Sequence, residues 1–374
     1  MVETIYNIRP AQPADANSIV AIFEAAYNDY PDQVYRNPDE LAQVINLTDA
    51  TEIFVIELSN KRSNLTQTSI IGTGSIRYTD DNDVAELCKA AIDPAYQGLR
   101  HASSGQSAYR SLLTTRIDSA YDTGAKILRT KANSSAHAIT QREHHKQGFV
   151  PVGVSKGRYR EVFSGKGRED IVFMMDSASM YRPFGKSDTV TLHLHPDCIP
   201  FVEYVIDTFQ TTTGHALQRT IKPTRSIWLD QQIDEWMFSF DKTIDRHENL
   251  SIECSVYPSD GGMSLEAIVD EIEHLISNSE FKFASVALNA NHPSAAVLWS
   301  KLNNLGFHLE AFEPDLLRKD GINDRLRLQR PPEETSKAQF IDPALELLDR
   351  QSIGYRILSD LEPIPVSDVT AVVL

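Results

Sequence analysis

The sequence predicts an α/β (α+β) chain in which a mixed central sheet is flanked by helices, built from two successive units of similar order. Two observations support this prediction. Short apolar runs typical of strands alternate with stretches whose apolar residues recur at helical spacing. One order of elements also occurs twice: a helix, a strand ending near an Asn, a helix, a Gly-Phe pair and a strand. At 374 residues, the chain is long enough for two domains.

The first half begins with predicted strands and helices in alternation. Gly72 and Gly74 within one predicted strand indicate a bulge, because glycine inside a strand often marks one. The polar stretch 59–68 is predicted to be the loop of a hairpin. In order, we predict a strand at 5–9, a helix opening at Pro13, a helix near 38–45, and the hairpin strands 52–58 and 69–78.

The central stretch of this half runs from a buried strand into a helix. The strand ends at Ile92, since Pro94 supplies no ladder donor and restricts the residue before it. A loop of small residues follows, and the next helix carries apolar residues at Leu112, Leu113, Ile117 and Tyr121. A helix that begins after such a loop presents unpaired N–H groups and a positive dipole end, which bind phosphate well.

The residues of this loop resemble those of the GNAT acyl-CoA N-acyltransferases. Asp93, Pro94, Tyr96, Gln97 and Gly98 fit the family's pattern of Asp/Asn-Pro, an aromatic, Gln/Arg and small residues around the pyrophosphate of coenzyme A. The glycine expected next is Arg100, and Ala102 occupies the second small position, so a shifted cradle is expected one turn later. The resemblance therefore assigns acyl-CoA contacts to Gln97, Gly98, Arg100, His101, Ala102, Ser103, Ser104 and Gly105.

A second stretch is similar to the family's next motif. A strand over residues 125–133 ends at Asn133, a helix is predicted over 135–147, and Gly148-Phe149 precedes another strand. Asn133 is expected in the cofactor site. Many family members have a Tyr four residues before the glycine, which protonates the departing thiolate; here that position is His144. The alternative is that the imidazole of His144 only interacts favourably with the dipole at the C-terminal end of its helix.

The resemblance also suggests where acyl transfer would take place. The thioester carbonyl would meet a backbone N–H near Ala91 and Ile92, where the family splays two central strands. Glu86, on the same strand, is a candidate base whose pKa burial would raise. Its alternative is a Glu that faces solvent or pairs with Lys89 or Arg77.

The aromatic residues of the first loop have two interpretations. Tyr27, Tyr30 and Tyr35 flank Pro31 between the first two helices. In the family this region often forms the wall on the acceptor side. Aromatic packing beneath a loop explains the residues equally well.

The second half repeats the pattern without the Pro-x-x-Gln-Gly stretch. Asn289 or Asn291 corresponds to Asn133, and Gly306-Phe307 to Gly148-Phe149, so a degenerate second GNAT-like domain is expected. The expected division is 1–180, 187–330 and a tail over 331–374, with 181–185 as linker. Further elements are predicted as strands at 169–177, 190–194, 226–230, 250–256, 283–288 and 325–329 and helices at 199–209, 265–276 and 293–303.

Composition narrows the classes of partner. A net charge of −16 argues against nucleic acid or an anionic membrane as partner. It suits a cationic amine substrate, and solubility alone explains it equally well. Three separated Cys without CxxC spacing and a start with no leader pattern indicate a cytoplasmic protein. His193 and His195 alternate on a strand but have no third ligand at motif spacing, so no metal is expected.

The predicted function is acyl transfer from acetyl-CoA, or another acyl-CoA, to the primary amine of a small molecule or peptide by direct attack. A catalytically inactive acyl-CoA sensor or interaction scaffold is the alternative, because Arg100 and His144 depart from the family pattern. A homodimer is expected only by analogy with the fold.

Overall fold

We describe the chain from a computed structural model. Its described residues fall into two compact units, and each unit is treated by itself. Unit 1 holds the described residues up to 131 together with 181–183, and unit 2 holds the others. The predicted division at 1–180, 187–330 and 331–374 stays a prediction. The structure describes residues 5–27, 30, 32–47, 50–62, 65–78, 83–133, 139–155, 177–183, 190–214, 216–224, 237–244, 249–257, 262–278, 281, 283–314 and 324–330.

The sheet of unit 1 is mixed, as predicted. Its strands lie in the order β1-β2-β3-β4-β5, antiparallel up to β4, with β4 and β5 parallel. Parallel neighbours need a long crossover connection, and between β4 and β5 this connection contains helix α3. The bounds are β1 Ile5–Pro10, α1 Ala16–Ala26, α2 Pro38–Asn46, β2 Thr51–Arg62, β3 Leu65–Tyr78, β4 Val84–Ile92, α3 Ala108–Asp122 and β5 Ile127–Asn133, with short 3₁₀ turns η1 Pro13–Asp15, η2 Gln33–Arg36 and η3 Pro94–Tyr96.

The hairpin of β2 and β3 is longer than predicted. The stretch 59–68, expected to be a loop, pairs as strand from Ser59 opposite Thr68 to Arg62 opposite Leu65. A polar composition predicted a loop here. A two-stranded ribbon satisfies its backbone groups within its own ladder, so polar side chains do not prevent the strands from continuing.

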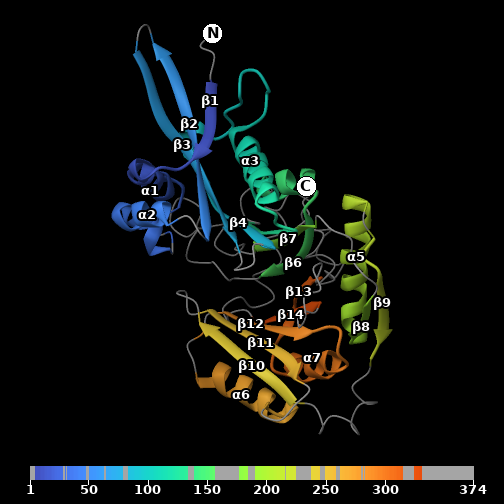
Figure 1. The fold of residues 1–374 in the computed structure, drawn as a ribbon. Coiled ribbons are helices and arrows are strands. Elements are labelled where there is room, and N and C mark those ends of the chain that lie inside the picture. The colour runs from blue at the N-terminus through green and yellow to red at the C-terminus, as the bar shows by residue number, and fades with distance from the viewer. Residues whose placement is uncertain are drawn as a thin grey trace, which may run out of the picture. The chain divides into compact units, whose positions relative to one another are not determined.

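Helices cover the two faces of this sheet (Figure 1). The hydroxyl of Tyr35, in η2, lies 2.7 Å from that of Ser75, so odd-numbered residues of this part of β3 face α1 and α2. The neighbouring Gly74 faces the guanidinium of Arg116 from α3. Period-two alternation along the strand therefore separates an aromatic and aliphatic core under α1 and α2 from the core under α3.

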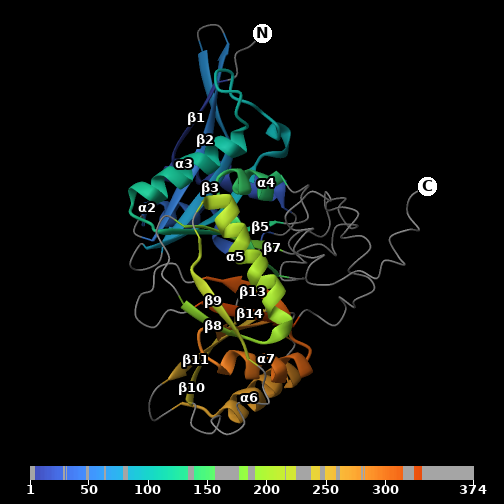
Figure 2. The same ribbon diagram turned by 90° about the vertical axis from the view of Figure 1, so that its right-hand side faces the viewer.

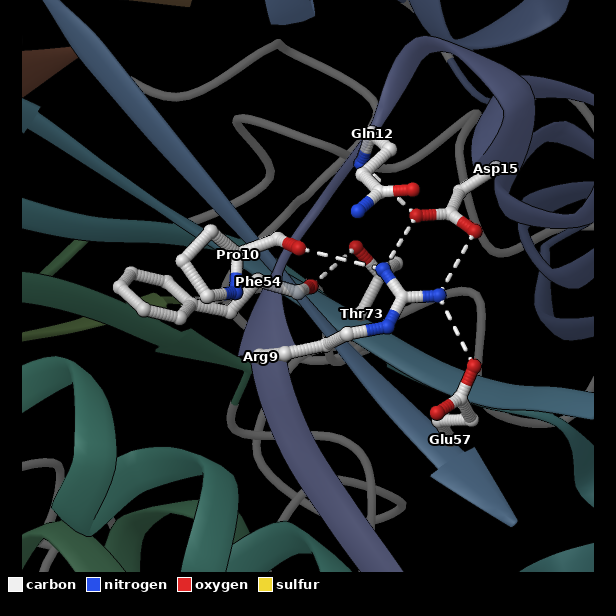
Figure 3. Close-up of polar contacts among 7 residues, drawn as sticks. All are labelled: Arg9, Pro10, Gln12, Asp15, Phe54, Glu57 and Thr73. Carbon is white, nitrogen blue, oxygen red and sulfur yellow. Dashed lines mark hydrogen bonds and ion pairs between the residues drawn. The ribbon is translucent and has the colours of Figure 1, made fainter. Parts of the chain in front are cut away.

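An ion-pair cluster joins β1, β2 and the start of α1 (Figure 3). Arg9 donates to both carboxylate oxygens of Asp15, at 2.7 and 3.0 Å, and to Glu57 at 3.0 Å. Asp15 also accepts the backbone N–H of Gln12 at 2.8 Å. The cluster fixes the angle at which the chain leaves β1 and enters the helix.

Within unit 2 the strands lie in the order β6-β13-β14-β12-β11-β10, with both parallel and antiparallel neighbours. Helices α6 and α7 pack on each other and on β10 and β12 (Figure 2). Strands β8 and β9 form a separate parallel pair, in which β9 contacts α5 and β8 contacts α7. The bounds are α4 Ile139–Lys146, β6 Val150–Ser155, β8 Val190–Leu194, α5 Ile199–Thr213, β9 Arg219–Pro223, β10 Met237–Ile244, β11 Asn249–Tyr257, α6 Leu265–Asn278, β12 Phe283–Asn289, α7 Ser294–Asn304, β13 His308–Glu313 and β14 Arg325–Arg330, with β7 Ser177–Pro183 shared between the units.

The repeated order of elements has a structural counterpart. In both units an antiparallel pair is followed by a parallel pair: β3-β4-β5 in unit 1 and β10-β11-β12 in unit 2. Helices α4 and α7 both end in the same way. Gly148 and Gly306 have φ of 83° and 84°, and the N–H of the following Phe bonds back to His144 or Leu302.

Three predictions in the fold were wrong. Strands β9 and β10 were missed, residues 181–183 belong to β7 and not to a linker, and Tyr121 is 62% exposed. The inner stripe of α3 passes instead through Arg116 and Ala120, which are buried. The tail 331–374, the strand predicted at 226–230, and the strand predicted at 169–177 up to residue 176 lie outside the described residues.

Candidate active site on strand β4

A bulge interrupts β4 between its two halves. Thr73 pairs with Ala91 and Ser75 with Cys88, so Gly74 alone lies opposite Lys89 and Ala90. Lys89 has φ of 51°, the one positive φ outside glycine among the described residues. The bulge predicted within the glycine-containing strand is confirmed at Ile71 of β3, since Ile56 pairs with Gly72 and Glu57 with Ile70. The bulge opposite Gly74 is a second one, and its extra residue is on β4.

The two parallel strands of unit 1 share only part of their length. Registered pairing joins Val84–Leu87 to Ile127–Thr130, while β4 continues to Ile92 and β5 to Asn133. The hydroxyl of Thr130 donates to the carbonyl of Leu87 at 2.8 Å and closes the last rung. Beyond the bulge β4 therefore continues outside the registered ladder, at the part of the strand that contains Ala91 and Ile92.

The loop after β4 forms a small hairpin of its own. Arg100 and Ser107 form an isolated bridge, and the N–H of His101 donates to the carbonyl of Gln106 at 2.8 Å. Gly105, with φ of 67°, lies at the return of this hairpin. Of the residues predicted for the phosphate cradle, those from Arg100 to Gly105 share this hairpin, and Gln97 and Gly98 precede it. Most of the predicted residues are exposed: Gln97, Gly98, Arg100, Ala102, Ser103, Ser104 and Gly105.

Helix α3 begins at the base of this hairpin. Ser107 is its N-cap and accepts the N–H of Arg110 at 3.3 Å. The N–H of Ala108 donates to the carbonyl of Leu99 at 2.9 Å. Arg100 and Ala102 lie in the hairpin before the helix, and Gly105 lies two residues before its N-cap. The predicted shift of the phosphate cradle stays a prediction.

Glu86 is not the high-pKa carboxylate that the sequence predicted. It pairs with Arg77, directly opposite on β3. Burial acts to raise the pKa of Glu86, but the neighbouring positive charges, led by Arg77, outweigh it and the pKa is lowered. The alternative interpretation, a Glu paired with Arg77, is the arrangement found.

The tyrosines of the first loop form an aromatic cluster on the same face as Glu86. Ring centroids lie 4.5 Å apart between Phe23 and Tyr30, 4.7 Å between Phe23 and Tyr35, and 5.0 Å between Tyr27 and Tyr30. The Tyr27 hydroxyl donates to the carbonyl of Ala90, within the bulge, at 3.2 Å. The cluster therefore both packs beneath the loop and contacts the bulged part of β4.

Arg116 is a buried residue next to the bulge that the sequence analysis did not single out. It is 1% exposed, and its Nη1 donates to the carbonyls of Ser75 and Cys88 at 3.3 and 3.2 Å. Burial lowers its pKa. Since Cys88 directly precedes the bulge, the guanidinium stabilises the backbone at the point where β4 is distorted. A charged residue within a helix usually indicates the face exposed to solvent. The one sign in the sequence that α3 packs closely on the sheet was Gly74, whose missing side chain leaves room for the guanidinium.

The remaining predicted residues belong to unit 2. His144 is 2% exposed, with Nδ1 2.8 Å from the carbonyl of Thr140 and its ring edge-on to Phe149 at 5.0 Å. Asn133 ends β5, and its side chain lies outside the described residues. The roles predicted for these two residues stay predictions.

The corresponding strands of unit 2 are uninterrupted. β11 pairs with β12 along Asn249–Cys254 and Phe283–Leu288, with no register shift. His193 on β8 and His292 before α7 both have lowered pKa values, caused first by burial. Among the described residues, no group of three or more His, Cys, Asp or Glu is placed to hold a metal ion, and no described helix is long and apolar enough to span a membrane.

No family model and no curated protein matches the chain. Solved structures do. A spermidine N-acetyltransferase SpeG chimera from Vibrio cholerae and hSSAT is 18% identical over 48% of this chain and 95% of its own, with a TM-score of 0.35. The ribosomal-protein-S18-alanine N-acetyltransferase from Escherichia coli is 17% identical over 49% and 97%, with a TM-score of 0.34. The yncA structure from Salmonella typhimurium, solved with acetyl-CoA, is 20% identical over 49% and 96%, with a TM-score of 0.35.

These solved structures are acetyltransferases, and another of similar likeness is described as a member of the GNAT family. Each of these similarities covers about half of this chain, at an identity of 20% or less. The candidate site is described from three features of this chain alone. They are the bulge at Lys89, the end of the β4–β5 ladder at Leu87 and the exposed hairpin before α3.

Proposed function

We propose that unit 1 binds an acyl-CoA, acetyl-CoA or another, and transfers its acyl group to a primary amine by direct attack. The observation that carries the proposal is the end of the β4–β5 ladder at Leu87, directly before the bulge. Backbone groups that leave a ladder are available to a ligand, and a thioester carbonyl needs one such N–H donor near Ala91 and Ile92.

The reaction has three requirements. The ammonium first loses a proton to a base or to water. The amine nitrogen then attacks the thioester carbon while the carbonyl oxygen is held by a backbone N–H. As the C–S bond breaks, the nitrogen loses its second proton and the CoA thiolate takes up one proton, which leaves an amide and free thiol. Glu86, ionised beside Arg77, is suited to electrostatic attraction of the ammonium more than to proton removal. His144 remains the candidate proton donor to the thiolate.

Cofactor binding would use the exposed hairpin and the start of α3. The negative pyrophosphate would be attracted to the positive N-terminal end of α3, a 15-residue helix. The hairpin before this helix contains the small residues Ala102, Ser103, Ser104 and Gly105. Arg100 adds a positive charge at the base of the hairpin, where its Nη1 donates to the carbonyl of Gly105 at 2.9 Å.

A charge placed at either end of α3 tests this site. Ser104→Asp puts a negative charge in the hairpin, and Thr123→Asp puts the same charge at the exposed far end of the helix. We expect S104D to weaken acetyl-CoA binding in calorimetry at least tenfold and T123D to leave it unchanged. Equal effects of the two variants, or no binding by the unaltered protein, would contradict the proposed site.

A second candidate function is an acyl-CoA sensor or scaffold without turnover. It is favoured by two observations: Glu86 has a lowered pKa, and His144 is buried. Release of free thiol from acetyl-CoA in the presence of a panel of primary amines separates the candidates. Acetyl-CoA binding without thiol release from any amine would support the sensor, whereas amine-dependent release that Glu86→Gln and His144→Phe both reduce would support the enzyme.

A further inference from the structure

Lys89 is the residue of the bulge whose side chain enters the aromatic cluster. Its ammonium lies 4.4 Å from the ring centroid of Tyr35 and forms an ion pair with Asp32. Both are contacts by which proteins recognise ammonium groups: the face of an aromatic ring and a carboxylate. The ammonium thus lies between the carboxylate of Asp32 and the ring of Tyr35, and the rings of Phe23, Tyr27 and Tyr30 pack against one another beside Tyr35. These five residues are hereafter called the tyrosine cage.

The backbone at this position is unfavourable for a lysine. A φ of 51° is in the left-handed region that residues with a Cβ adopt rarely, and glycine would adopt it without strain. The structure nevertheless keeps a long cationic side chain here. In this conformation the ammonium meets both a carboxylate and the face of an aromatic ring.

The cage is built and reachable. Tyr35 is buried, and its hydroxyl is 2.7 Å from that of Ser75, so the ring that faces the ammonium is fixed on the sheet. The side chains of Lys89 and Asp32 are 23% and 25% exposed. A rigid floor with a partly exposed ion pair above it is open to exchange with a solute cation.

We infer that the tyrosine cage is a binding site for primary alkylammonium groups, and that Lys89 fills it as an internal ligand. A compact ammonium on an aliphatic stem matches both contacts, whereas a planar guanidinium would need a second carboxylate oxygen in register. That an acyl acceptor displaces Lys89 from this cage rests on the proposed function; that the cage binds alkylammonium ions does not.

The test restores the missing part of the side chain as a separate molecule. Lys89→Ala removes three methylene groups and the ammonium, which together correspond to n-propylammonium. We expect n-propylammonium chloride to raise the melting temperature of K89A saturably, by a few degrees above equal NaCl, once it exceeds its dissociation constant about tenfold. No acyl-CoA is present, so failure of acyl transfer cannot produce or hide the effect.

Matched variants separate the cage from general salt effects. Lys126→Ala removes the same group from an ion pair with Asp83 at 2.9 Å, away from the tyrosine cage. We expect n-propylammonium to act on K126A and the unaltered protein only as NaCl does, and K89A/D32N to lose the response. Equal responses in K89A and K126A, or an unchanged response in K89A/D32N, would overturn the inference.

A second variant covers the case in which K89A does not fold. Lys89→Gly removes the backbone strain together with the side chain, and n-butylammonium then corresponds to the missing part. We expect K89G to be stabilised by n-butylammonium chloride and not by n-butanol or NaCl. Absence of that stabilisation in folded K89G would also overturn the inference.

Discussion

The guanidinium of Arg116 occupies the space that a side chain at position 74 would take. A Cβ on Gly74 would lie 3.0 Å from Cζ and 3.1 Å from Nε and Nη1 of Arg116. Because Gly74 is also the residue opposite the bulge, the absence of its side chain lets α3 approach the distorted part of β4. The burial of Arg116 therefore depends on the absence of a side chain at position 74.

This relationship predicts coupled effects of substitution. We expect Gly74→Ala to destabilise the protein by about 1–3 kcal/mol, because the methyl group overpacks the site. Arg116→Ala should cost a similar amount or more, since the carbonyls of Ser75 and Cys88 lose a donor and a cavity remains. In denaturant unfolding the double variant should be less destabilised than the sum, because the guanidinium that the methyl group meets is gone. Additive effects would show that the contact is not the cause.

The ion pair of Glu86 and Arg77 predicts a dependence of stability on pH. The pKa of Glu86 is lowered in the folded chain, so its contribution to the free energy of unfolding is full above its unfolded pKa of about 4.3 and is lost as pH falls through the folded value. We expect Glu86→Gln to be less stable than the unaltered protein at pH 7 and to approach it below pH 4. Unfolding curves between pH 3 and 7 measure this. A constant difference across that range would contradict the lowered pKa.

The sequence predicted the parts of the site that rest on local chemistry. The strand to Ile92, the break at Pro94 and a helix after small residues follow from backbone rules that operate over a few residues. The state of Glu86 does not, because its pKa depends on Arg77, which the hairpin brings opposite it. Arg116 was missed for the same reason: only tertiary packing decides that a charged residue of α3 faces the sheet.

The cluster around Arg9 predicts unequal roles for its two carboxylates. Asp15 receives both guanidinium nitrogens and the N–H of Gln12, whereas Glu57 receives one nitrogen. Burial acts to raise the pKa of Asp15, but the hydrogen bonds from Arg9 and Gln12 lower it overall. We expect Asp15→Asn to cost about 1–3 kcal/mol at pH 7, more than Glu57→Gln, with the Asp15 contribution lost as pH falls below about 3.9. Thermal unfolding of both variants at pH 7 and 3 provides the comparison, and a larger loss in E57Q would refute it.

Unit 2 holds a buried carboxylate whose recorded partners are hydroxyl groups. Glu310 on β13 is 3% exposed, and its two oxygens accept from Ser155 on β6 and Ser285 on β12. Removing one donor leaves a buried acceptor unsatisfied, so we expect Ser155→Ala and Ser285→Ala each to cost about 1–3 kcal/mol. Replacing all three polar groups together should cost less than the sum of the single changes, because no orphaned oxygen remains.

The apolar replacement E310L/S155A/S285A therefore provides the decisive comparison with S155A and S285A in denaturant unfolding. The free energy of unfolding of Glu310→Leu alone should lie between those of the single serine variants and the triple variant. Each hydroxyl group that it leaves behind can turn toward a backbone carbonyl of its own strand. If instead the triple variant is the least stable of the set, the carboxylate contributes net stabilisation between β6, β12 and β13 that apolar packing does not replace. Binding of acetyl-CoA by the triple variant, measured alongside, should match the unaltered protein, because none of these residues belongs to unit 1.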